Sequence, residues 1–295
     1  MTLSYIEPLY RPPSEANSLI LQVTNGCSWN HCAFCEMYTS PQKRFSITKS
    51  KNIHNLVKSA AEDEPETRRI FLADGDALVL STRRLLEILE SINQHFSKIN
   101  RVSAYCLPRN IRSKSVNEMK ELQDAGLKLV YVGAESGDDE LLKIINKGES
   151  QQTTINSLQK LSQANIKTSV MILNGLGGKQ YSQQHAINSA HMINEIQPNY
   201  LATLVISFPL GEERFRSHFP TEFLPLNQNE LFREMEKFIQ LTDLKNTIFR
   251  SDHASNYLSL KGILGKDKEN MLNILNQAIH TPELLNLRPE WMRGL

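Results

Sequence analysis

Three of the chain's four cysteines lie close together in the sequence, at Cys27, Cys32 and Cys35. Thiolates at this spacing can bind a single metal centre, because cysteine sulfur is a strong ligand for both iron and zinc. On a cubane iron–sulfur cluster, three cysteine ligands leave one iron without a protein ligand. Since an open coordination position distinguishes catalytic metal centres from closed structural ones, the spacing predicts a reactive cluster.

A structural zinc ion is an alternative for the same segment, with His31 as a further ligand. Structural zinc sites usually take a second pair of ligands from a distant part of the chain, and neither Cys106 nor the scattered histidines provide one. Disulfide bonds are less expected still, because a chain of this length can bury a core without them. With one cysteine left over, an auxiliary cluster is also excluded.

The charges of the chain are nearly balanced, with 33 basic and 32 acidic residues and a net charge of +1. A chain without a strong overall field has no general attraction for nucleic acid or for an anionic membrane surface. Residues 1–10 carry no basic residue, and no stretch approaches the roughly 20 apolar residues of a spanning helix. We therefore expect a cytoplasmic protein without a membrane partner, and a reducing compartment suits its thiolates. Nucleic acid is not favoured as a partner, although a tRNA-modifying enzyme remains open.

Apolar strand patterns and helical patterns alternate from residue 18 to residue 210, which predicts an α/β core. Six strand–helix units of this kind form a partial (β/α)6 TIM-like barrel, in which chemistry takes place at the carboxyl ends of the strands. The prolines of residues 1–17 favour an extended N-terminal arm. Residues 211–295 are expected to form a mostly helical C-terminal extension covering the barrel, with helices over 229–241 and 268–279.

Polar residues follow the ends of several predicted strands, where a barrel would bring them to one face. By composition they are ordinary turn and capping residues, so their position rather than their type makes them candidates. The segments are Asp74-Gly75-Asp76, Cys106 with Arg109 and Asn110, Glu135-Ser136, and Asn174-Gly175.

The cysteine segment, with Phe34 directly before its last cysteine, resembles the cluster loop of the radical S-adenosylmethionine (SAM) superfamily. Four residues separate Cys27 from Cys32, whereas most members of that superfamily have three. The resemblance implies that Cys27, Cys32 and Cys35 bind a [4Fe–4S] cluster and that SAM is the cofactor bound at its open iron. It also places Phe34 beside the cofactor.

The strand ends are similar to the SAM-binding motifs of the same superfamily. Asp74-Gly75-Asp76 stands where members carry Gly-Gly-Glu, so the resemblance assigns it to the methionyl ammonium of SAM. It assigns Glu135-Ser136 to the ribose and Lys147 to the carboxylate, although a lysine near a helix end also compensates the helix dipole. Backbone at Asn174-Gly175 is expected to pack against the adenine.

The activity that the resemblance implies is reductive cleavage of SAM to a 5′-deoxyadenosyl radical, which abstracts a hydrogen atom from a small organic substrate. An electron donor such as flavodoxin or ferredoxin is then an expected partner. A different class also remains open, a haem- or metal-binding carrier protein with a structural cluster or zinc site. The residues that could face the substrate are Cys106, Arg109, Asn110, His253, Asn256 and Tyr257. A polar surface turn explains His253, Asn256 and Tyr257 equally well.

Overall fold

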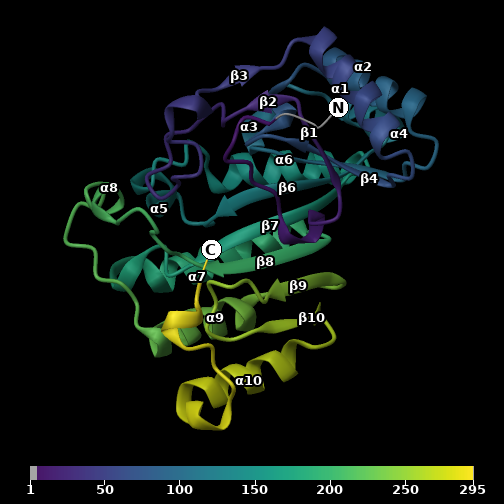
Figure 1. Ribbon diagram of the computed structural model, residues 1–295. Helices are drawn as coiled ribbons and strands as arrows, with labels where there is room; N and C mark the ends of the chain where they lie inside the picture. Colours follow the sequence, from purple (N-terminus) through teal and green to yellow (C-terminus); the bar gives the residue numbers. More distant parts are fainter. Residues whose placement is uncertain (1–4, 295) are drawn as a thin grey trace. The chain divides into compact units, whose positions relative to one another are not determined.

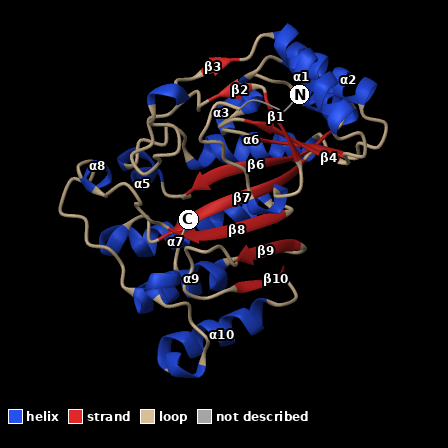
Figure 2. Cartoon of the chain, in the orientation of Figure 1, coloured by secondary structure: helices blue, strands red, loops and turns tan. Residues whose placement is uncertain are grey.

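The computed structural model describes residues 5–294, and the chain forms two compact units. The first unit contains the chain up to Asn30, Cys35–Val132 and Asn156–Thr168. The second contains His31–Phe34, Gly133–Ile155 and the chain from Ser169 onward. Figure 1 labels most of the helices and strands of both units, and Figure 2 colours them by type.

The first unit is built on parallel strands that read in the sequence as nearly continuous apolar runs. Their order is β1-β4-β5-β6, with register pairs such as Leu21 with Leu72. Strands that are buried on both faces need no alternation of polar and apolar residues. Their bounds are β1 (Leu19–Gln22), β4 (Arg69–Ala73), β5 (Arg101–Tyr105) and β6 (Leu127–Glu135), whose last three residues belong to the second unit. The short strands β2 (Thr24–Asn25) and β3 (Ser46–Ile47) form a separate antiparallel pair.

Helices connect these parallel strands, because parallel pairing requires a long crossover. Local capping sets where two of them begin. Ser81 accepts a hydrogen bond from the Arg84 amide in front of α2, and Ser115 and Glu118 cap each other's amides in front of α4. The helices of this unit are α1 (Ser50–Asp63), α2 (Thr82–His95), α3 (Pro108–Arg112), α4 (Val116–Asp124) and most of α6 (Gln151–Gln163). Short 3-10 turns lie at Pro13–Glu15, Pro41–Lys43 and Ala77–Val79.

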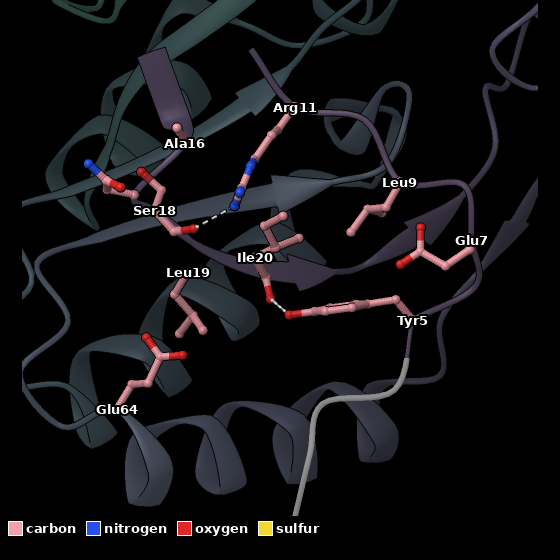
Figure 3. Close-up of a pocket in the computed structure, with 10 residues that line it drawn as sticks. Tyr5, Glu7, Leu9, Arg11, Ala16, Ser18, Leu19, Ile20 and Glu64 are labelled. Carbon is pink, nitrogen blue, oxygen red and sulfur yellow. Dashed lines mark hydrogen bonds between the residues drawn. The ribbon is translucent and has the colours of Figure 1, made fainter. Parts of the chain in front are cut away.

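The N-terminal arm is attached to the first unit through a buried carboxylate. Glu15 is fully buried and accepts hydrogen bonds from the Tyr131 hydroxyl at 2.6 Å and from Arg101 Nη2 at 2.7 Å. Nearer the start of the chain, the Tyr5 hydroxyl donates to the Ile20 carbonyl of β1. A pocket of about 600 Å³ lies beside this part of the arm. Figure 3 shows residues that line it. The predicted arm therefore lies along β1, and its first four residues lie outside the described part of the chain.

The second unit also alternates strands and helices. Its strands have the order β7-β8-β9-β10, and β10 alone runs antiparallel to its neighbour β9. The strands are β7 (Lys167–Asn174, in this unit from Ser169), β8 (Tyr200–Val205), β9 (Thr247–Ser251) and β10 (Leu260–Leu264). The helices are α5 (Asp139–Ile144), α7 (Gly178–Ile196), α8 (Glu213–Arg216), α9 (Gln228–Leu241) and α10 (Lys268–His280), followed by 3-10 turns at Pro282–Leu284 and Glu290–Met292.

The chain after residue 210 contains strands as well as the expected helices. Helices α9 and α10 confirm the helical predictions over 229–241 and 268–279, but β9 and β10 lie between them. Each of these strands contains a basic residue, Arg250 or Lys261, which interrupts the apolar run that marks the other strands in the sequence.

The strand pairs within the two units are parallel except β2 with β3 and β9 with β10. The predicted α/β class with a mostly parallel sheet is therefore confirmed, and this arrangement is typical of a partial TIM-like barrel. Among residues 5–294, each helix is too short or too polar to cross a membrane.

Candidate functional site

The cysteine loop begins where β2 ends and is divided between the two units. Cys27 and Cys35 belong to the first unit, Cys32 belongs to the second, and all three are half-buried. Among the described residues, no three side chains of histidine, cysteine, aspartate or glutamate are gathered as they would be around a metal ion. The three cysteine ligands therefore stay a prediction at this point.

Asp76, at the end of β4, is hydrogen bonded to the residue that follows Cys27. Its buried carboxylate accepts from the Ser28 amide at 2.8 Å, from the Ser28 hydroxyl, and from Asn110 Nδ2 at 3.2 Å. Burial raises the pKa of Asp76, while the hydrogen bonds from Ser28 and Asn110 act against that rise. The two predicted site residues Asp76 and Asn110 thus lie together and hold the start of the cysteine loop.

Gly75 lets the end of β4 approach the same loop. A Cβ atom at this position would lie 2.9 Å from both Cα and Cβ of Cys27 and 2.9 Å from a ring carbon of Tyr38. Distances this short exclude any side chain, so the position requires glycine. The backbone at Gly75 therefore approaches the cysteine loop closely.

Asp74 forms a buried ion pair that the sequence does not predict. Its carboxylate pairs with Lys43, and both side chains are completely buried. Lys43 Nζ also donates to the Ile6 carbonyl at 2.8 Å, and the Asp74 amide donates to Thr24 Oγ1 at 3.1 Å. Burial and the charge of Asp74 raise the pKa of the neighbouring Tyr38 well above its usual value. The pair therefore connects the arm, β2 and β4 beneath the cysteine loop.

The substrate-facing candidates of the first unit have contacts within that unit. The Arg109 guanidinium lies 3.8 Å from the ring centroid of Trp29, a cation–π contact with the cysteine loop. Cys106 is buried, and its thiol donates to the Leu107 carbonyl at 3.2 Å. Arg109 is thus a neighbour of the loop, whereas Cys106 is a core residue.

In the second unit, Glu135 and Lys147 form an ion pair of 2.9 Å in which each side chain is about 5% exposed. Glu135 has a φ of +66°, and a Cβ atom on Gly133 would lie 2.1 Å from its Oε1. Its other oxygen, Oε2, is buried and has no hydrogen-bond partner among the described residues. Lys147 Nζ lies 5.8 Å from the ring centroid of Phe34. The predicted cofactor residues Phe34, Glu135 and Lys147 therefore lie together, and Glu135 Oε2 is a buried acceptor that could receive a hydrogen bond from a ligand.

A second buried network joins the other predicted cofactor positions of this unit. Ser136 Oγ lies 2.8 Å from His185 Nδ1, and the Gly175 amide donates to Glu234 Oε1 at 2.6 Å. His185 Nε2 and Glu234 Oε1 are 4.0 Å apart. Burial lowers the pKa of His185 to about 4 and raises that of Glu234 to about 7, so both side chains favour their neutral forms. The neighbouring Asn174 donates from Nδ2 to the Leu231 carbonyl at 3.2 Å.

Sequence reasoning missed His185 and Glu234, although one of them had a detectable signal. Glu234 lies on α9 among the apolar residues Leu231, Met235 and Phe238, where a charged side chain interrupts the buried face. Such an interruption indicates a buried polar contact.

The substrate-facing candidates after β9 serve the chain's own backbone. Asn256 is buried, accepts from the Val205 amide at 2.8 Å and donates to the Thr203 carbonyl at 2.9 Å. The guanidinium of Arg293 lies 4.0 Å from the ring centroid of Tyr257. In the same turn, His253 Nδ1 lies 3.1 Å from the Ser255 amide, and Arg288 donates to the His253 carbonyl at 2.8 Å. This turn is thus held by β8 and by the C-terminal tail.

Comparison with known proteins links the chain to one family. The model described as the Radical SAM superfamily matches residues 21–190. The heme chaperone HemW of Bacillus subtilis is 22% identical over 166 residues, which are 55% of this chain and 43% of HemW. The tRNA uridine(34) acetyltransferase of Methanocaldococcus infernus is 25% identical over 162 residues, which are 52% of this chain and 29% of that enzyme. The chain therefore spans less than half the length of either curated relative.

Solved structures share the fold at low identity. Coproporphyrinogen III oxidase (HemN) from Escherichia coli, described as a radical SAM enzyme, matches with a TM-score of 0.57 and 13% identity over 76% of this chain and 52% of HemN. Methylornithine synthase (PylB) matches with a TM-score of 0.51 and 13% identity over 77% of this chain and 63% of PylB. The methyltransferase TsrM from Kitasatospora setae, solved with cobalamin and a [4Fe–4S] cluster, has a TM-score of 0.51 and 18% identity over 63% of this chain and 36% of TsrM.

Proposed function

The chain belongs to the radical SAM superfamily, whose family model covers more than half of it, and from this premise we propose that it cleaves SAM reductively. As a member of this family it is an enzyme whose cofactors are a [4Fe–4S] cluster and SAM. The observation that carries the proposal is the three-cysteine loop within the matched region, which provides the ligands Cys27, Cys32 and Cys35.

The chemistry that the cluster and SAM supply when bound is the one-electron cleavage of the sulfonium to methionine and a 5′-deoxyadenosyl radical, which takes a hydrogen atom from the substrate. The chain's own contribution is to bind, orient and exclude water. We assign thiolate ligation to the three cysteines, and Asp76 fixes the loop by accepting from the Ser28 amide.

Glu135 is the residue whose surroundings best suit a ligand. We propose that its buried Oε2, which lacks a partner among the described residues, accepts a hydrogen bond from a ribose hydroxyl of SAM. Lys147 neutralises the Glu135 carboxylate and supplies a positive charge for the carboxylate of SAM. Ser136 and backbone at Asn174-Gly175 are assigned to the nucleoside, and Phe34 to contact with the cofactor.

Only one oxygen of Asp74, Oδ2, pairs with Lys43, and its Oδ1 is buried without a hydrogen-bond partner among the described residues. We propose that Oδ1 and the backbone carbonyl of Gly75 accept from the methionyl ammonium. A small organic substrate and a one-electron donor such as flavodoxin or ferredoxin complete the proposal, in a reducing cytoplasm where the cluster survives.

Anaerobic reconstitution with iron and sulfide, followed by dithionite and SAM, tests this function. We expect 5′-deoxyadenosine and methionine from the loaded chain, and neither product from the triple variant C27A/C32A/C35A. Cys106→Ala serves as the matched control, since that cysteine lies in the core and should leave iron content unchanged. A fully loaded cluster that yields no 5′-deoxyadenosine with any candidate substrate would contradict the proposal.

A haem carrier is the second candidate, because the curated relative from Bacillus subtilis is named a heme chaperone. Titration of the anaerobic chain with haem distinguishes the two. Stoichiometric haem binding without SAM cleavage favours the carrier, whereas SAM cleavage without a haem absorption band favours the enzyme on a small substrate.

A further inference from the structure

The part of the cysteine loop that belongs to the second unit is held residue by residue. Asn146 Nδ2 donates to the His31 carbonyl at 3.1 Å, and the Ala33 amide donates to the Ile145 carbonyl at 2.8 Å. Between them, Arg214 Nη2 donates to the Cys32 carbonyl at 3.0 Å. Two of these contacts come from the end of α5, but Arg214 comes from α8, far along the chain.

Helix α8 is too short to be stable alone, so packing must hold Arg214 in place. Phe215, Phe219 and Phe223 are buried in one apolar cluster that also contains Ala33 of the cysteine loop. Their ring centroids lie 4.8 to 5.0 Å apart, the separation of aromatic rings in direct contact. We call residues 208–223 the phenylalanine segment. Its packing fixes the loop and the helix that carries Arg214 against the same core.

The end of the phenylalanine segment is also attached to the start of α7. The Lys179 amide donates to the Leu224 carbonyl at 2.8 Å, and a Cβ atom on Gly178 would lie 2.7 Å from a ring carbon of Phe223. Arg216, two residues after Arg214, instead serves the segment itself: it donates to the Phe223 carbonyl at 2.7 Å and pairs with Glu212 at 2.8 Å.

We propose that Arg214 is a positioning residue for the middle cysteine of the cluster, and that its charge makes the cluster easier to reduce. This inference rests on the proposed ligation by Cys32. The hydrogen bond fixes the backbone of Cys32, and the guanidinium brings a positive charge close to it.

The expected electrostatic effect follows from the covalent geometry. Because the bonded carbonyl and the sulfur belong to one residue, the charge stays within roughly 8 Å of the sulfur. Reduction adds one electron to the cluster and no proton, so a nearby positive charge stabilises the product. At an effective dielectric constant of about 20 and a distance of about 8 Å, this attraction favours the reduced cluster by about thirtyfold.

Three variants test the two parts of the proposal: R214Q removes the charge, R214K keeps it while changing the donor geometry, and R216Q is the matched control on the same helix. The first readout is the rate at which Cys32 is alkylated in the chain without iron, followed by mass spectrometry. The second is the midpoint potential of the reconstituted cluster, from a dithionite titration followed by electron paramagnetic resonance.

We expect R214Q and R214K both to speed alkylation of Cys32. R214Q alone should lower the ratio of reduced to oxidised cluster about thirtyfold at a given potential, which is about 90 mV for one electron at 59 mV per tenfold. Values for R214Q that equal those of the unaltered chain in both readouts would overturn the inference. If the unaltered chain takes up no iron, the proposed function fails, while the alkylation rates still decide whether Arg214 positions Cys32.

Discussion

The buried pair of His185 and Glu234 predicts an unusual dependence of stability on pH. Burial lowers the pKa of His185 from its ordinary value of 6.5 to about 4, and raises that of Glu234 from 4.5 to about 7. Between these limits the folded chain keeps both groups neutral, whereas the unfolded chain carries a protonated histidine and an ionised glutamate. The histidine therefore makes stability rise with pH from about 4 to 6.5, and the glutamate makes it fall from about 4.5 to 7.

The two slopes oppose each other. Together, His185 and Glu234 therefore contribute almost no pH dependence to the stability of the native chain between about pH 4.5 and 6.5. Each shift corresponds to roughly 3 kcal/mol, since one pKa unit is about 1.4 kcal/mol. The variant Glu234→Gln keeps an acceptor for the Gly175 amide but removes the acidic titration. Relative to the native chain, its free energy of unfolding should rise by about 3 kcal/mol between pH 4.5 and 7, because the opposing contribution of Glu234 is gone.

Urea unfolding followed by circular dichroism at several pH values measures this difference. The variant His185→Gln should show the opposite trend, a fall in stability between pH 4.5 and 7 that comes from Glu234. If the difference between Glu234→Gln and the native chain is the same at every pH in this range, Glu234 does not titrate as its burial implies and the reasoning is refuted.

Three further predictions concern the cysteine loop and the cofactor residues. Lys43→Met leaves the buried Asp74 carboxylate without its partner and should lower the free energy of unfolding by about 3–5 kcal/mol, while the double variant with Asp74→Asn recovers most of this loss in the same urea assay. Gly75→Ala places a Cβ atom 2.9 Å from Cys27, so iron content after reconstitution should fall by more than half; full loading would show that the loop adjusts. Glu135→Gln should weaken SAM binding about tenfold by calorimetry with iron content unchanged, and an unaltered affinity would remove Glu135 from the nucleoside site.

Local patterns in the sequence were sufficient for the main elements. The parallel strands read as apolar runs because both of their faces are buried, and α2 and α9 carry their apolar residues on one face. The position of the cysteine loop after a strand could be predicted for the same reason. Strands β9 and β10 could not, because a basic residue interrupts the apolar run in each of them.

The partners of the polar residues could not be read from local sequence. Lys43 lies between Gln42 and Arg44 in a polar segment, and only the tertiary fold buries it beside Asp74. The carboxylate of Asp76 was predicted to face a ligand, but it accepts from the Ser28 amide nearby in the loop. Sequence spacing indicates which strand end a side chain follows, and long-range packing decides which group that side chain meets.

The ligation of one cluster by three cysteines is tested most directly by counting iron and sulfide in the anaerobically reconstituted chain and in its C27A, C32A and C35A single variants. The account predicts about four of each per unaltered chain, and a loss of the cluster's electron paramagnetic resonance signal in all three variants. A variant that retains the full iron and sulfide content with an unchanged signal would contradict it.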